Sequence, residues 1–154
     1  MESVESVAAG DEAGRRRVMG LAARATLAEL DAALAAIGAP DCADVRRPEV
    51  GLVMLRGRMG GDGAPFNLGE ATVTRAAVRL ATGEIGHSYS LGRDAARARL
   101  AAILDALWLR GDREPIETCF IRPVAARLEK ERAERAAKTA ATRVDFFTLV
   151  RGED

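Results

Sequence analysis

Apolar residues recur along the chain with two different spacings, so the sequence predicts both helices and strands. Leu27, Leu30, Leu34 and Ile37 lie three or four positions apart, which is the spacing of one helix face. A second helical pattern precedes them, starting at about Arg15. The two patterns together predict two successive helices near the N-terminus.

Polar residues and glycine mark the ends of these helices. Thr26 and Glu29 have the spacing of a capping box, in which each side chain bonds to the backbone N–H of the other. Gly38 and Pro40 are expected to end the helix that follows. Residues 1–13 show no periodicity and are expected to form a flexible tail.

Alternating positions predict strands in the middle of the chain. Residues 50–58 carry apolar side chains on both faces, which is typical of a strand buried on both sides. We expect an irregular connection before it (41–48) and a loop after it (59–65). Residues 70–80 and 85–91 then alternate on either side of a tight turn, which predicts a β-hairpin.

The last third of the chain is expected to be mostly helical. Residues 94–110 have a continuous apolar stripe at helical spacing, with Asp94 placed as the N-cap. Residues 115–122 are a candidate for a short strand. Pro123 suits the first turn of a helix that would run to about Thr142.

These elements predict an α+β fold. We expect a small, mainly antiparallel sheet, with the hairpin at about 70–91, N-terminal helices, the central amphipathic helix and a C-terminal helix. Residues 14–142 would form a single domain. Residues 143–154 turn apolar again and would form an extended docking arm.

The composition indicates a core that is short of bulky side chains. The chain has 154 residues, and 31 of its apolar residues are alanine, whereas Leu, Ile, Val and Phe together number only 35. Thirty-five is about 23% of the chain, just above the level of about 20% below which chains tend to be disordered. We therefore expect the protein to complete its core against a partner.

Charge and cysteine content exclude several classes of protein. The 23 basic and 23 acidic residues cancel, which argues against general nucleic-acid binding. The longest apolar stretch is about ten residues, and a membrane span needs about 20, so no membrane partner is expected. Cys42 and Cys119 lie far apart and predict neither a disulfide framework nor a metal site. The expected location is the cytoplasm.

Arginine is strongly favoured over lysine among the basic residues. Lys130 and Lys138 are the only lysines, so 21 of the 23 basic residues are arginine. Guanidinium groups make two-point contacts with phosphate and carboxylate that lysine cannot make. The excess of alanine and arginine is also what a GC-rich genome would produce, and the composition alone leaves both explanations open.

Candidate chemistry is sparse, and each candidate also has a structural explanation. His87 is the only histidine, so an imidazole acid–base step would depend on it. By strand alternation it shares a face with Tyr89, but no carboxylate is close in sequence to orient it. Arg75 and Arg79 share a strand face, as solvated arginines often do. The glycines of the 59–65 loop could form an anion-binding nest or a plain connection.

Two further segments could bind an anion or a partner. Arg93 precedes the helix that Asp94 would cap, and a helix N-terminus can bind an anion, although a cap explains Asp94 equally well. The arm carries large apolar side chains close to the chain end, which suggests docking: Phe146, Phe147, Leu149 and Val150.

Four sequence blocks, taken together and in order, resemble one protein family. They are RMGGDG at 58–63, NLGEATVTRAAVRL at 67–80, GRD at 92–94 and RVDFFTLVRG at 143–152. This pattern resembles the G subunit (PhnG) family of the bacterial carbon–phosphorus lyase system. The likeness covers residues from about 15 to 152.

The resemblance implies a role in a multi-subunit enzyme. It implies a core complex built with the H, I and J subunits. With the I, H and L proteins, such a subunit takes part in the displacement of adenine from MgATP by a phosphonate such as methylphosphonate. The product is α-D-ribose 1-methylphosphonate 5-triphosphate. The chemistry would lie mainly on the I subunit, with this chain accessory to it and MgATP as a substrate of the complex rather than a cofactor held by this chain.

If this chain contacts the substrates, the family chemistry suggests roles for the candidates already named. The polyanions would be bound by arginines, for which the candidates are Arg58, Arg75, Arg93 and Arg151. The leaving adenine needs a proton or a hydrogen-bond donor, for which His87 or Asp94 would serve. A free-standing module that binds nucleotides or phosphonates is the alternative function.

Overall fold

The fold is α+β, as the sequence predicts, and is described here from a computed structural model for residues 2–38, 40–60 and 62–142. The backbone alone is described for residues 2–11. The elements in chain order are α1 (Glu2–Ala22), α2 (Leu27–Ile37), β1 (Cys42–Gly57), β2 (Phe66–Leu80), β3 (Ile85–Leu91), α3 (Ala95–Arg110), α4 (Arg113–Ile116), the π-helical segment η1 (Glu117–Ile121) and α5 (Arg122–Ala141).

The three strands form one antiparallel sheet with β2 in the centre. The predicted hairpin is confirmed, because β2 and β3 pair from Val73↔Leu91 to Arg79↔Ile85. β1 pairs along almost all of β2, from Cys42↔Leu80 to Gly57↔Phe66. The sheet therefore has three strands near one end and only two near the other.

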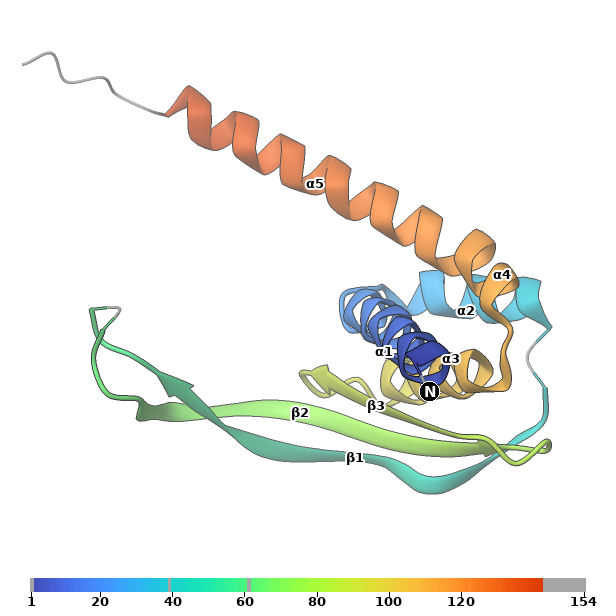
Figure 1. The fold of residues 1–154 in the computed structure, drawn as a ribbon. Helices are drawn as coiled ribbons and strands as arrows, with labels where there is room; N and C mark the ends of the chain where they lie inside the picture. Colours follow the sequence, from blue (N-terminus) through green and yellow to red (C-terminus); the bar gives the residue numbers. More distant parts are fainter. Residues whose placement is uncertain (1, 39, 61, 143–154) are drawn as a thin grey trace, which may run out of the picture.

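The helices α1, α2 and α3 cover one face of the three-stranded end, and α5 extends beyond them as a long rod (Figure 1). Helix α3 is the centre of the core, because its side chains at nine positions are buried. The largest fully buried side chains come from every part of this layer: Val18, Leu30, Val78, Leu80, Leu104, Leu107, Ile116, Phe120, Ile121 and Val124. Within the described residues, no helix is long and apolar enough to cross a membrane.

A glycine allows α3 to lie directly on the sheet. A Cβ atom added to Gly86 of β3 would come within 2.1 Å of the Ala102 carbonyl oxygen and 2.3 Å of the Ala106 nitrogen. These distances are far inside van der Waals contact, so only glycine permits this approach of strand and helix. The neighbouring Ser88 hydroxyl is buried and donates to the Ala98 carbonyl at 2.5 Å.

The helix ends follow the sequence closely. The Glu29 backbone N–H donates to the Thr26 hydroxyl and the Thr26 backbone N–H donates to the Glu29 carboxylate, so the predicted capping box is present. Gly38 ends α2 with a φ of 77°. Asp94 caps α3 by accepting from the backbone N–H of Arg97 at 2.9 Å.

Four features of the structure differ from the sequence prediction, the first two in segments expected to be irregular. Helix α1 already begins at Glu2, so the backbone of the expected 1–13 tail is helical from residue 2. Alanine and glutamate favour a helix there without giving it an apolar stripe. Residues 42–48 of the expected 41–48 connection belong to β1, where register shifts between Asp44 and Glu49 obscure the alternation.

The other two differences concern burial and helix type. The sequence predicts that residues 50–58 are buried on both sides. Leu52 is nevertheless 62% exposed, because neither β3 nor α3 reaches this end of the sheet. Residues 115–122 are helical rather than a strand. Their large apolar side chains Ile116, Phe120 and Ile121 are buried at helical spacing, and the Arg122 N–H donates to the Glu117 carbonyl in a π-type bond. The predicted arm, 143–154, lies outside the described residues.

Candidate functional site

The face of the sheet opposite the helices carries the candidate residues Arg75 and His87. Arg75 on β2 pairs with Tyr89 on β3, and Ala77 pairs with His87, so Arg75, His87 and Tyr89 share one face. Strand alternation predicted that His87 and Tyr89 point away from Ser88, and this is confirmed: both are exposed and Ser88 is buried. Figure 1 shows that the described helices lie on the other side of the sheet.

A shallow pocket of about 240 Å³ lies on this open face. Its lining comes from all three strands: Val45, Arg46, Arg75, Ala76, Ala77, His87 and Tyr89. The alanines form a floor that leaves room between the longer side chains. The pocket thus combines two guanidinium groups, an imidazole and a phenol around a small apolar base.

Glu49 on β1 organises the cationic side of this pocket. Its carboxylate accepts hydrogen bonds from Arg46 at 2.5 Å and from the Arg75 Nε at 2.6 Å. These bonds, first from Arg46 and then from Arg75, hold the pKa of Glu49 below its ordinary value. Tyr89 and then Glu49 raise the pKa of Arg75. Two guanidinium groups share one carboxylate, so Arg46, Glu49 and Arg75 together keep a net positive charge.

Sequence reasoning missed Glu49, and the reason is a bulge. The register between β1 and β2 shifts between Arg46 and Glu49, which brings Glu49 opposite Arg75. An opposite charge paired with an arginine across two strands is a recognisable signal only when the register is known. The sequence predicts an irregular connection over 41–48 and a strand only from residue 50, so it gives no register for Glu49.

The backbone of His87 is anchored firmly, while its side chain is exposed. Its N–H donates to Asp105 Oδ2 of α3 at 2.8 Å. Asp105 is buried and also accepts two hydrogen bonds of 2.7 Å from Arg15 of α1. Among the described residues, no carboxylate contacts the imidazole, so the geometry contains no Asp–His pair of the kind that a catalytic triad needs.

The other candidates are not brought to this pocket. Arg58 lies just past the end of β1, at the two-stranded end of the sheet, and Arg93 lies between β3 and α3. Neither lines the pocket. Asp94 caps helix α3, which is a structural role and needs no contact with substrate. Arg151 and the docking candidates Phe146, Phe147, Leu149 and Val150 lie outside the described residues.

The described residues between β1 and β2, 58–60 and 62–65, contain turns rather than a helix or a strand. Gly60 has a φ of 69°, in the left-handed region that glycine adopts easily. A Cβ atom on Gly63 would lie 2.6 Å from the Met59 carbonyl oxygen, so the turn is tight. Within the described ranges, no group of three His, Cys, Asp or Glu side chains is arranged to hold a metal ion.

The two-stranded end of the sheet presents an unusual apolar surface. We call residues 52–57 of β1 and 66–72 of β2, which extend past the last pair with β3, the distal ribbon. Five large apolar side chains of the distal ribbon are more than 40% exposed: Leu52, Met54, Leu55, Phe66 and Leu68. Large exposed apolar side chains in this number are typical of surfaces that bind another protein or a ligand.

A family model and a known protein both match nearly the whole chain. The family model described as "Phosphonate metabolism protein PhnG" matches residues 13–152. A protein of Rhizobium meliloti (strain 1021) is 56% identical over 155 residues, covering 98% of this chain and 99% of that protein. It is named "Alpha-D-ribose 1-methylphosphonate 5-triphosphate synthase subunit PhnG".

Proposed function

Because the chain belongs to the PhnG family of phosphonate-metabolism proteins, we propose that it is a subunit of an α-D-ribose 1-methylphosphonate 5-triphosphate synthase. The synthase works in organophosphonate catabolism, with the I, H and L proteins, and this chain is also part of a core with the H, I and J subunits. In its transferase reaction a phosphonate oxygen of methylphosphonate bonds to C1′ of the ribose of MgATP. The bond from C1′ to the adenine nitrogen breaks, and adenine leaves with a proton.

The observation that carries this proposal is the exposed apolar distal ribbon. Burying a side chain such as Leu or Phe stabilises a protein by about 1.5–3 kcal/mol. The ribbon leaves five such groups in water, including Leu68 at 63% exposure. A chain that works alone would gain nothing from this surface, whereas a subunit gains an interface. The surface supports membership of an assembly, and in this proposal the chemistry of that assembly lies mainly on the I subunit.

The open sheet face is the part of this chain best suited to help the reaction across an interface. Departure of adenine requires a proton or hydrogen-bond donor, and the phosphonate and triphosphate groups require cationic partners. His87 and Arg75 supply one group of each kind on a single exposed face. Glu49 is a positioning residue, since it holds the Arg75 guanidinium in place.

The chemistry demands no resident cofactor from this chain. MgATP enters as a substrate of the complex, and the magnesium ion arrives on its phosphates. The synthase reaction changes no oxidation state, because a carbon–nitrogen bond is exchanged for a carbon–oxygen bond. The expected location of the complex is the cytoplasm, where MgATP is available.

The experiment uses the isolated chain and the assembled complex side by side, with ATP and methylphosphonate as substrates. The isolated chain should release no adenine, and the complex should release it. Arg75→Ala and His87→Ala should assemble normally and lower the rate by tenfold or more. Arg79→Ala, on the same strand, is the matched control. Adenine release by the pure chain would overturn the accessory role, and normal rates in both variants would remove the contribution of the open face.

A further inference from the structure

The side of the molecule away from the open sheet face holds a second pocket, lined mostly by helix α5. It has a volume of about 260 Å³. Leu21 and Arg24, at the end of α1 and just after it, form one wall, and the other wall comes from one face of α5: Ala125, Leu128, Glu129, Arg132 and Arg135. We call this the arginine pocket. Nothing in the function proposed above uses it.

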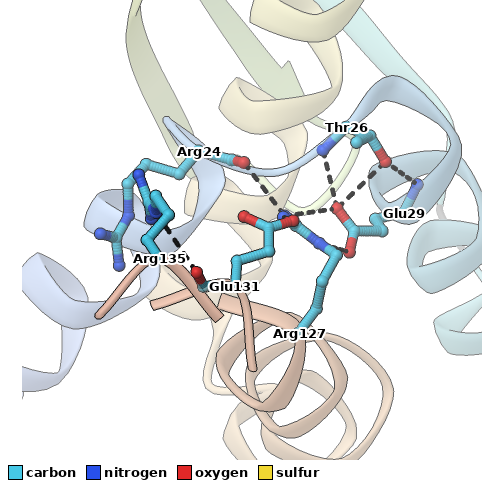
Figure 2. Close-up of polar contacts among 6 residues, drawn as sticks. All are labelled: Arg24, Thr26, Glu29, Arg127, Glu131 and Arg135. Atoms are coloured by element: carbon cyan, nitrogen blue, oxygen red, sulfur yellow. Dashed lines mark hydrogen bonds and ion pairs between the residues drawn. The ribbon is translucent and has the colours of Figure 1, made fainter. Parts of the chain in front are cut away.

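The walls of the arginine pocket are fixed by a network around Arg127, which Figure 2 shows. The Arg127 guanidinium donates two hydrogen bonds to the Glu29 carboxylate, at 2.5 and 3.0 Å, and one to the Arg24 carbonyl at 3.2 Å. It also bonds to Glu131 at 2.7 Å. The start of α5 is therefore tied to the corner between α1 and α2, and the backbone of Arg24 is held by the same group.

The pocket gathers arginines that have no carboxylate partner among the described residues. In the described part of the chain, neither Arg24 nor Arg132 forms an ion pair, whereas Arg16, Arg46 and Arg99 all do. Arg135 uses its Nε for a 3.3 Å bond to the Glu131 carbonyl, which leaves its terminal nitrogens available. Figure 2 shows the side chains of Arg24 and Arg135 reaching to the same side of the network.

Three guanidinium groups and one carboxylate, that of Glu129, give the pocket a net positive charge in a small concave space. Gathering like charges is unfavourable unless an anion neutralises them. Guanidinium groups match phosphate in shape and make two-point bonds to it. A chain of linked phosphates has several negative charges at short spacing, as this arrangement requires. A ligand with a single carboxylate would leave the pocket with a net positive charge.

We propose that the arginine pocket binds a chain of phosphate groups, either the triphosphate of a nucleotide or free polyphosphate. Leu21 and Leu128 form the apolar part of the lining and would contact the uncharged end of such a ligand. The pocket lies on the helical side of the sheet, so it is separate from the Arg75 and His87 surface. Its phosphate binding is independent of the synthase role, and the two can fail separately.

The test is calorimetry on the full chain with inorganic tripolyphosphate. Arg24→Ala and Arg132→Ala should each weaken binding by about tenfold or more, which is the loss of one charge-assisted contact. Arg122→Ala is the matched control, since it removes an exposed arginine from the same helix about ten residues away. It should leave the affinity within twofold. Raising the salt concentration should weaken binding to the wild-type chain.

The two phosphate sources and the competing occupant give different results. Tighter binding of ATP than of tripolyphosphate supports a nucleotide ligand, and equal binding supports a bare phosphate chain. The proposal is overturned if the wild-type chain binds neither compound, or if both alanine variants bind as the wild type does. If the variants bind tripolyphosphate normally but are no longer pulled down with the partner subunits, the pocket is an interface for acidic protein groups instead.

Discussion

Arg15 and Asp105 are 90 positions apart in the sequence, and their side chains meet through two hydrogen bonds of 2.7 Å each. Asp105 is only 1% exposed, and it also accepts from the backbone N–H of His87. One buried carboxylate therefore joins α1, α3 and β3. Sequence periodicity places Asp105 on an otherwise apolar helix face but gives no sign of its two partners.

Removing this carboxylate should be strongly destabilising. Asp105→Ala removes both bonds from Arg15 to Asp105 and leaves the His87 N–H without its acceptor, and an unsatisfied buried group alone costs about 1–3 kcal/mol. The free energy of unfolding from urea denaturation measures the loss. Glu12→Ala removes an exposed pair with Arg16 on the same helix as Arg15 and should change it by less than about 1 kcal/mol. Equal effects of the two substitutions would contradict the structural role of Asp105.

Gly86 should tolerate no side chain. Gly86→Ala places a Cβ atom 2.1 Å from the Ala102 carbonyl oxygen, so α3 must move away from the sheet. Overpacking of this kind costs about 1–3 kcal/mol, measured as the free energy of unfolding. The control is Gly51→Ala in β1, where a Cβ atom meets nothing within 4 Å. That variant should be as stable as the wild type, and a large loss there would show that the close approach is not the cause.

The Thr26–Glu29–Arg127 network should make stability depend on pH. Burial raises the pKa of Glu29, but the hydrogen bonds from Arg127 and Thr26 outweigh burial and hold it below the ordinary 4.5. A carboxylate with a lowered pKa in the folded state stabilises the fold above pH 4.5. That stabilisation is lost as the pH falls through the folded-state pKa.

The measurement is the difference in unfolding free energy between the wild type and Glu29→Gln across this pH range. The difference should be about 1–2 kcal/mol above pH 5, from the lost charge-assisted bonds, and should shrink below pH 4.5. Glu134→Gln, an exposed change on α5, should show no difference at any pH. A difference that stays constant from pH 6 to pH 3 would contradict the assignment to Glu29.

The distal ribbon should be needed for assembly but not for folding. Leu52→Ser combined with Met54→Ser removes two side chains that are 62% and 54% exposed, so the free energy of unfolding should change little. Recovery of the chain with its partner subunits in a pull-down should fall by tenfold or more, because each lost contact is worth about 1.5–3 kcal/mol. Full recovery of this variant would show that the ribbon faces solvent in the complex.

Local signals predicted the elements whose chemistry is contained in a few neighbouring residues. The Thr26–Glu29 box, the Asp94 cap and the hairpin with His87 and Tyr89 on one face are all present. In each case the hydrogen bonds or the alternation involve residues close together in sequence, so tertiary packing had little to change.

The sequence predictions fail where burial or contact depends on distant parts of the chain. An apolar strand such as Leu52 to Met54 looks buried in sequence, but its burial depends on how far β3 and α3 extend. Glu49 reaches Arg75 only because of a bulge in β1. The arginine pocket joins residues about 100 positions apart, from Arg24 to Arg132, and no local pattern could indicate it.

If this chain is a working part of the synthase rather than a free-standing module, the synthase should not work without it. The direct measurement is adenine release from ATP and methylphosphonate by the partner subunits, with this chain omitted and then added back. We predict that omission abolishes release and that adding the purified chain restores it. Release at the full rate without the chain would contradict the account.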